Sequence, residues 1–354
     1  MFKLKCDDFL IYDEATGTYS MSAEQKVRDE TEKNSWKSAG WTILKDWRLY
    51  AMLIPMVLVY FLWKYMPMYE LMACFKNPTF GDSSGKVATY TWSGLNFFKE
   101  LFTDRTNSPL FWRAFRNTFT TAFYGLLFGF PMPIILALFF NEVKSNVARS
   151  IMQVCVYLPK FLSTVIVTSL VLVLFRSNVE GSVGIVSKVF QAFGADPALV
   201  NGGLVYTTKY YRAIYIITDL WEHAGYDSIV FFAAVIAVSP TSYEAAQIDG
   251  AGKMAQMRYV VLPSILSTVV IMLIMKIGSL LSVGYEKIYL LLGDGQGTGG
   301  NWEVADTVST LANRWTGTNK SMGTAAEMLN NLIGMILVIG ANKIARKASD
   351  VSLY

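Results

Sequence analysis

Apolar residues gather into six long runs along the chain, and shorter polar segments separate them. A transmembrane helix needs about 20 mostly apolar residues, so each run is long enough for one. The last run is the weakest, because Glu327, Asn330 and Asn331 lie near its start. The pattern predicts an all-α membrane protein with six transmembrane helices, over residues 49–73, 114–140, 151–175, 211–238, 263–285 and 323–342.

The polar segment 239–263, between the fourth and fifth runs, is shaped by a few residues. Ser239 can cap a helix whose first residue is Pro240. Gly250 permits the left-handed backbone that ends a helix. A second short helix follows, and Pro263 opens the next run. We therefore expect a helix–turn–helix that projects from the membrane, with small residues at its bend where a partner surface can approach closely.

The other two long polar segments, 77–102 and 292–315, are expected to be loops outside the cell that carry short surface helices. Lys and Arg set the orientation, because loops on the cytoplasmic side carry an excess of them. With the N-terminus inside, the inner segments hold 15 basic residues and the outer segments hold 11. Both termini and segment 239–263 are then cytoplasmic.

Three regions follow from this topology. Residues 1–48 form a cytoplasmic N-terminal tail, of which 1–34 is expected to be mostly flexible. At its end, Trp36, Trp41 and Trp47 are spaced among lysines, which is typical of a segment lying at the lipid headgroups. Residues 49–345 form the transmembrane domain, and 346–354 form a cytoplasmic C-terminal tail.

The amino-acid composition is typical of an integral membrane protein. Apolar residues make up 53% of the 354 residues and charged residues 16%, whereas soluble domains carry about 25% charged residues. A net charge of +4 is too small to indicate a nucleic-acid partner. Three cysteines form no disulfide framework.

The chain offers little catalytic chemistry of its own. Segments 81–87 and 293–300 are rich in glycine, but neither fits the phosphate-binding pattern GxxxxGK[ST]. His223 is the single histidine, so no metal site is expected. Glu222 and His223 would be the candidates for an intramembrane hydrolase. Adjacent helix positions diverge by about 100°, which argues against their forming one site.

Charges inside the apolar runs need partners, since a charge near the centre of the bilayer costs about 2.5–3.5 kcal/mol. Lys276 and Glu222 lie at similar predicted depths and have opposite signs. We expect them to pair, with Asp219 as second choice for Lys276. Such a pair could line or gate a path through the membrane, or it could be a structural clamp between helices. A proton-driven secondary transporter is the alternative to an ATP-driven one, and transport by the purified chain without any ATPase would favour it.

Segment 244–263 resembles the EAA loop of binding-protein-dependent ABC importer permeases. The family pattern is Glu-Ala-Ala, three residues, Gly, nine residues, an aliphatic residue, one residue and Leu-Pro. Met257 stands where a Phe is frequent. The matching positions are Glu244, Ala245, Ala246, Gly250, Val260, Leu262 and Pro263, and Asp249 and Ala251 match the version found in sugar importers.

Further stretches, among them "WKYMPMYELMACFKNP", "FPMPIILALFFNEV" and "DLWEHAGYDSIVFFAAV", are similar to polysaccharide-type sugar permeases of the LplB-like group, within the MetI-like and MalF-like superfamily. The resemblance covers about residues 45–345. It implies a MetI-like permease in a bacterial plasma membrane. It also implies four partners: a second, homologous permease, two ATPase subunits that bind ATP and Mg²⁺, and an extracellular solute-binding lipoprotein. No cofactor is expected on this chain itself.

In that family the EAA helix fits a groove on the ATPase, with Glu244 as polar anchor and Gly250 as turn. The resemblance also implies a sugar substrate, with oligosaccharides favoured. Sugar importers hold hydroxyl groups with polar side chains and stack rings on aromatic ones. Interfacial anchoring is the alternative for each aromatic residue. The candidate path residues are Trp221, Glu222, Tyr226, Lys276, Tyr285 and Glu286.

Overall fold

The computed structural model describes residues 10–13, 18–21, 47–80, 87–175, 184–194, 203–292 and 302–349. The chain divides into two compact units, Met1–Glu70 and Leu71–Tyr354. The two glycine-rich segments weighed as nucleotide sites, 81–87 and 293–300, lie almost wholly outside the described residues, and so do Trp36 and Trp41.

The first unit contains a small hairpin and a long apolar helix. Strands β1 (Leu10–Asp13) and β2 (Thr18–Met21) pair antiparallel and form a hairpin within the segment that was expected to be mostly flexible. Helix α2 (Trp47–Tyr60) continues as a π-helical turn, Phe61–Tyr65, and a 3₁₀ segment, Met66–Phe75. Pro67 lacks the N–H that a regular α-helix would use there. The run Ala51–Phe75 is long and apolar enough to span a membrane, as predicted.

A second hairpin and a short helix follow the first span. Strands β3 (Lys76–Phe80) and β4 (Val87–Trp92) pair antiparallel, with a register shift at Thr79/Phe80. Helix α3 (Asn96–Thr103) buries Phe97 and Leu101. Surface helices were expected in this segment, and the structure has strands as well as a helix that is partly buried.

Two further runs are single candidate spans. Helices α4 (Asn107–Gly129) and α5 (Pro131–Glu142) together form a candidate span over Asn107–Glu142. Helix α18 (Lys320–Ser349) contains another over Lys320–Lys347. Its polar residue Asn330 is buried and donates to the carbonyl of Leu281 at 3.1 Å, which explains how an amide is tolerated in this apolar run.

Three further candidate spans are bent pairs of helices. Helix α6 (Asn146–Tyr157), with a 3₁₀ turn to Phe161, meets α7 (Thr164–Phe175) at 97°, and α10 (Tyr211–Ile236) meets α11 (Pro240–Ile248) at 69°. The third pair is bent by 63° at Ile265. It joins α12 (Lys253–Gln256), the π-turn Met257–Val261 and α13 (Leu262–Ser264) to α14 (Leu266–Gly278). The fold is therefore mostly helical, with three to six candidate spans.

The predicted bounds of two spans need correction. The third span was predicted as one run over 151–175, and the structure bends it between Phe161 and Thr164. The fifth was expected to reach residue 285, but α14 ends at Gly278. Residue 285 begins a separate helix, α15 (Tyr285–Leu292).

Helices from distant parts of the sequence form the core at one end of the second unit. Helices α16 (Trp302–Ala305) and α17 (Val308–Thr318) join α3, α4 and α18 there. Leu311 is buried, and a Cβ built on Gly323 would lie 2.5 Å from the carbonyl oxygen of Ala312, so α17 and α18 pack backbone to backbone. Helix α17 is thus a core helix, whereas a surface helix was expected. Shorter pieces are α8 (Ile185–Ala192) and a 3₁₀ turn at Leu204–Tyr206.

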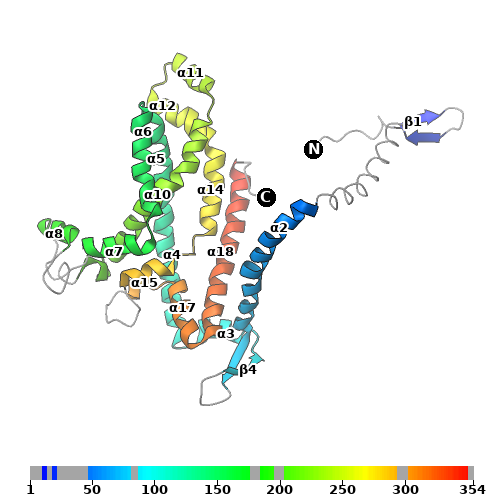
Figure 1. The fold of residues 1–354 in the computed structure, drawn as a ribbon, viewed down its shortest axis with the longest axis vertical. Coiled ribbons are helices and arrows are strands. Elements are labelled where there is room, and N and C mark those ends of the chain that lie inside the picture. Colours follow the sequence, from blue (N-terminus) through cyan, green and yellow to red (C-terminus); the bar gives the residue numbers. More distant parts are fainter. Residues whose placement is uncertain are drawn as a thin grey trace. The chain divides into compact units, whose positions relative to one another are not determined.

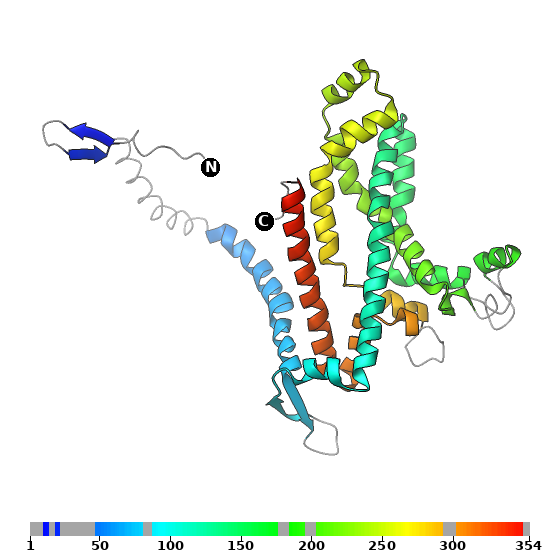
Figure 2. The same ribbon diagram turned by 180° about the vertical axis from the view of Figure 1, so that it is seen from behind.

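Figures 1 and 2 show the second unit as a bundle of lengthwise helices that includes α4, α10, α14 and α18. Helices α11 and α12 project at one end of the bundle. Helices α3, α15 and α17 lie at the opposite end.

Candidate functional site

The turn between α11 and α12 has the geometry of a Schellman cap. Gly250 has φ +77°, a conformation that glycine adopts without strain. Its N–H donates to the carbonyl of Gln247 at 3.0 Å, and the N–H of Ala251 donates to the carbonyl of Ala246 at 2.9 Å. These two bonds satisfy the last carbonyls of α11. The prediction that Gly250 ends this helix is confirmed.

The start of α11 differs in one detail from the prediction. Pro240 is the first residue of the helix and Ser239 occupies the capping position. The Ser239 hydroxyl does not cap the backbone; it lies 2.7 Å from the Thr241 hydroxyl instead.

Residues 239–256, called here the knuckle, present an exposed surface. Glu244, Ala245, Asp249 and Gly250 are exposed, and Ala246 and Ala251 are half-buried. Ile248 and Met254 are 87% and 74% exposed. Large apolar side chains displayed together on a polar segment mark interaction sites.

The second arm of the knuckle is tied to the bundle. The Lys253 ammonium pairs with the Glu142 carboxylate at the end of α5. The Gln256 side chain donates to the carbonyl of Ala251 at 2.7 Å and closes the turn. These contacts hold the part of the knuckle that follows Gly250.

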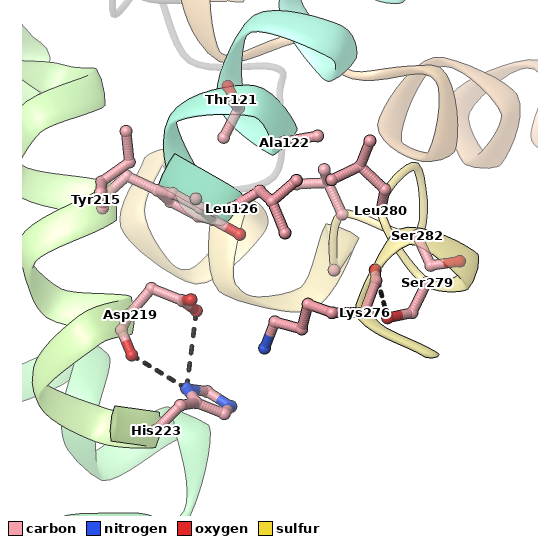
Figure 3. A pocket seen from close by; sticks show the side chains of 14 residues that line it. Thr121, Ala122, Leu126, Tyr215, Asp219, His223, Lys276, Ser279, Leu280 and Ser282 are labelled. Atoms are coloured by element: carbon pink, nitrogen blue, oxygen red, sulfur yellow. Dashed lines mark hydrogen bonds and ion pairs between the residues drawn. The ribbon is translucent and has the colours of Figure 1, made fainter. Parts of the chain in front are cut away.

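A cavity of about 210 Å³ lies between α4, α10 and α14. Figure 3 shows Lys276 reaching into the space toward Asp219 and His223, with Thr121 and Tyr215 nearby. The lining carries hydroxyl, carboxylate, imidazole and ammonium groups, a mixture that can hydrogen-bond a polyhydroxylated molecule. Its polar members are Thr121, Tyr215, Asp219, His223, Lys276, Ser279 and Ser282.

A second cavity, of about 200 Å³, shares Lys276 and Ser279 with the first and is also lined by Asp227. The Lys276 ammonium lies 3.3 Å from an Asp227 carboxylate oxygen. These side chains are 42% and 31% exposed, so the pair is accessible from the cavities. The ion pair therefore stands between two cavities that follow one another along α10 and α14.

The predicted partners of Lys276, Glu222 and then Asp219, were wrong. The predicted depths were counted from residue 263, but the bend at Ile265 makes α14 begin at Leu266. Lys276 then lies about 15 Å along its helix, and Asp227 lies about 14 Å from the inner end of α10. Glu222 is more than one turn further out.

Glu222 pairs instead with Lys287 on α15. The Lys287 ammonium lies 3.1 Å from Glu222 and 3.4 Å from Asp219, and it lies 5.2 Å from the centre of the Tyr215 ring. The side chains of Lys287 and Glu222 are each 7% exposed, so this pair is a buried clamp between α10 and α15. Lys287 was missed because α15 was expected to belong to an outer loop. The signal was a lysine inside the apolar run "YEKIYLLL".

Glu222 and His223 were expected to diverge, and the structure corrects this. Potential ligand atoms of Asp219, Glu222 and His223 all lie within 4.8 Å of one another, and His223 Nδ1 is 4.0 Å from Glu222. The Lys287 ammonium contacts both carboxylates. The group is therefore an ion-pair network in which Lys287 balances Asp219 and Glu222.

The remaining path candidates are exposed and are not among the residues that line the cavities. Trp221, Tyr226 and Tyr285 are 47%, 45% and 51% exposed, and Glu286 is exposed as well. Tyr226 packs edge-on against Phe161. None of the four lines either cavity. Their role in a path shared with another subunit stays a prediction.

The chain is similar in sequence to known bacterial proteins along most of its length. The chain is 32% identical over 340 residues to Protein LplB of Bacillus subtilis (strain 168), covering 94% of this chain and 100% of LplB. It is 35% identical over 312 residues to the polygalacturonan/rhamnogalacturonan transport system permease protein YteP of the same strain, covering 86% of this chain and 90% of YteP.

Among solved structures, a chain of a bacterial ABC transporter involved in the import of the acidic polysaccharide alginate has 35% identity and a TM-score of 0.74. The match covers 89% of this chain and 99% of that chain. Residues 129–311, which include the knuckle and both cavity-lining helices α10 and α14, match the family described as binding-protein-dependent transport system inner membrane component. The chain therefore belongs to this family of membrane permeases and has the MetI-like permease fold that the resemblance implied.

Proposed function

We propose that this permease imports carbohydrate, with oligosaccharides favoured, as one of two homologous permease subunits of an ATP-driven transporter in a bacterial plasma membrane. The names of similar proteins support a saccharide, since one transports polygalacturonan or rhamnogalacturonan and another imports alginate. The first cavity is lined by hydroxyl and charged groups and is suited to a polar substrate, whereas the second is mostly apolar apart from Asp227, Lys276 and Ser279.

The proposal is supported by the way the two arms of the knuckle continue into the two helices that carry the Lys276–Asp227 ion pair. Helix α10, which carries Asp227, leads into α11 after three residues, and the other arm leads through α13 into α14, which carries Lys276. A force applied to the knuckle therefore reaches both partners of the pair. Displacement of the knuckle would separate Lys276 from Asp227 or bring them together. This movement would open or close the route between the two cavities.

ATPase subunits are the partners that would apply this force. Glu244, Ala245, Ala246, Asp249, Gly250 and Ala251 would form the docking face, with Ile248 and Met254 adding exposed apolar area. ATP and Mg²⁺ would be bound by those subunits, and this chain would contribute no nucleotide site. Both termini and the knuckle would lie in the cytoplasm.

An extracellular solute-binding lipoprotein would deliver the sugar at the opposite end of the bundle. Support comes from a solved alginate ABC transporter in complex with a pentasaccharide-bound periplasmic protein. Its chain matches this one at 34% identity and a TM-score of 0.73.

One specific observation favours a second candidate, a proton-coupled transporter. Asp219, Glu222, His223 and Lys287 form a connected titratable network, and Asp219 and His223 line the first cavity. Reconstitution of the complete complex in proteoliposomes separates the two functions. The ATP-driven account predicts oligosaccharide uptake with ATP at the knuckle side and no proton gradient. Uptake driven by a proton gradient without ATP would contradict it.

A further inference from the structure

Four arginines lie on helices at the end of the second unit opposite the knuckle, about one helical turn beyond the first cavity. Arg113 and Arg116 lie on α4, Arg212 on α10 and Arg314 on α17. Asn117 and Arg212 each precede cavity-lining residues, Thr121 and Ile216, by four positions on the same helices. Residues four apart share a helix face, so Asn117 and Arg212 lie at the outer rim of the cavity.

Asp306 neutralises only part of this charge. Its carboxylate is fully buried and pairs with Arg113 at 3.7 Å and with Arg314. The Asn117 amide donates to the Asp306 carbonyl at 3.0 Å and to the Glu303 carbonyl at 2.8 Å. The Glu303 side chain itself is exposed. The network therefore fixes α4 against α16 and α17 and holds the rim in place.

The positive charges of Arg116 and Arg212 are not neutralised by Asp306. Within the described ranges, no carboxylate forms an ion pair with either of them. Arg212 donates through Nη2 to the Asn117 side-chain oxygen at 2.8 Å, and its Nε is buried without a hydrogen-bond partner. Arg116 is exposed, and its charge acts unfavourably on that of Arg212. Two like charges near a buried unpaired donor are stabilised by an anion placed between them.

We propose that Arg116 and Arg212 bind the carboxylate groups of an acidic, uronate-bearing oligosaccharide as it enters the first cavity. The guanidinium fork matches a carboxylate with two parallel hydrogen bonds. Asn117 is a positioning residue that orients Arg212 through its side-chain oxygen. The proposal rests on the proposed carbohydrate import and names the class of sugar.

The lysines further along the path, unlike the arginines at the rim, are paired with carboxylates. Lys276 is paired with Asp227, and Lys287 with Glu222 and Asp219. Carboxylates therefore balance the lysines along the cavities, and the excess positive charge is confined to the rim. An acidic sugar is attracted at the rim and is not retained by unpaired cations further along the path.

The test is equilibrium binding to the assembled permease–ATPase complex in phosphatidylcholine nanodiscs, without the binding protein. The probes are fluorescent trigalacturonate and its fully methyl-esterified counterpart, which has the same sugar backbone without the charge. We expect the acid to bind at least ten-fold more tightly than the ester. Arg116→Gln should weaken binding of the acid about ten-fold and leave binding of the ester unchanged.

Matched variants keep the experiment interpretable. Arg105→Gln removes an exposed arginine outside the cluster and should change nothing. If Arg212→Gln prevents assembly, Arg212→Lys is used instead. This variant keeps the positive charge and should preserve part of the preference for the acid. Equal binding of acid and ester, or no measurable binding of the acid, overturns the proposal. The proposal is also overturned if Arg116→Gln weakens binding of the acid only in nanodiscs that contain anionic lipid. Uptake of neutral oligosaccharides alone would remove this proposal and leave carbohydrate import standing.

Discussion

Lys276 and Asp227 meet at 3.3 Å between two cavities, on the two helices to which the arms of the knuckle connect. Neither residue is buried deeply enough to act only as a clamp. The buried clamp is a different pair, Lys287 with Glu222. The two lysines in this part of the molecule therefore have separable roles, and substitutions can distinguish them.

Breaking the accessible pair should impair transport more than stability. We expect Lys276→Met and Asp227→Asn each to reduce ATP-driven uptake, while the complex assembles normally. Pairs this exposed contribute about 0.2–1 kcal/mol, so the melting temperature should change little. The double variant Lys276→Met/Asp227→Asn should recover part of the uptake. Combining Lys276→Met with Glu286→Gln, which removes an exposed carboxylate outside the pair, is the control and should recover none; equal recovery in that control would contradict the Lys276–Asp227 pairing.

Breaking the buried pair should prevent assembly. Lys287→Met leaves Glu222 charged and buried, which costs about 3–5 kcal/mol. Thermal unfolding monitored by fluorescence size-exclusion should show a large loss, and Lys287→Met/Glu222→Gln should regain much of it. Lys188→Met, on the exposed face of α8, is the matched control. A Lys287→Met protein as stable as this control would rule out the clamp.

Gly225 is a close-packing position that a small change should disturb. A Cβ built there would lie 2.1 Å from the Val156 carbonyl oxygen, so α10 and α6 touch through their backbones. Gly225→Ala should destabilise the permease by about 1–3 kcal/mol, the usual cost of overpacking. Gly340→Ala on α18, where a Cβ meets nothing within 4 Å, should leave the melting temperature unchanged. Equal melting temperatures for the two variants would show that α6 yields easily.

The orientation can be tested by labelling single cysteines in a background that lacks the native ones. Ile248 and Thr318 are both exposed and lie at opposite ends of the second unit. A cysteine at Thr318 should react with an impermeant reagent in intact cells, and one at Ile248 only after the cells are opened. Ser321 is unsuitable as an outer probe, because it is buried and donates to the Lys76 carbonyl. Labelling of Ile248 in intact cells would reverse the topology.

The sequence was most informative where a local rule determines the structure. Gly250 was predictable because a left-handed turn after a helix favours glycine, and the long apolar runs were predictable from length alone. The partner of Lys276 was not, because the bend at Ile265 lies between apolar stretches on both sides and leaves no break in the pattern. Lys287 and Asp306 were also missed. Their segments look like loops until α15 and α17 pack into the bundle and bury them.

If the knuckle transmits ATPase movement to the Lys276–Asp227 pair, transport should depend on the left-handed turn at Gly250, which two neighbouring glycines can test. Gly250 has φ +77° and Gly252 has φ −69°, and a Cβ at either position meets nothing within 4 Å. Valine is therefore strained only at position 250. Uptake and binding-protein-stimulated ATP hydrolysis should be measured for both variants in the reconstituted complex. The account predicts that Gly250→Val assembles but loses more than ten-fold in uptake, whereas Gly252→Val stays close to the unmodified protein. Equal uptake by the two variants would contradict the coupling role of the knuckle.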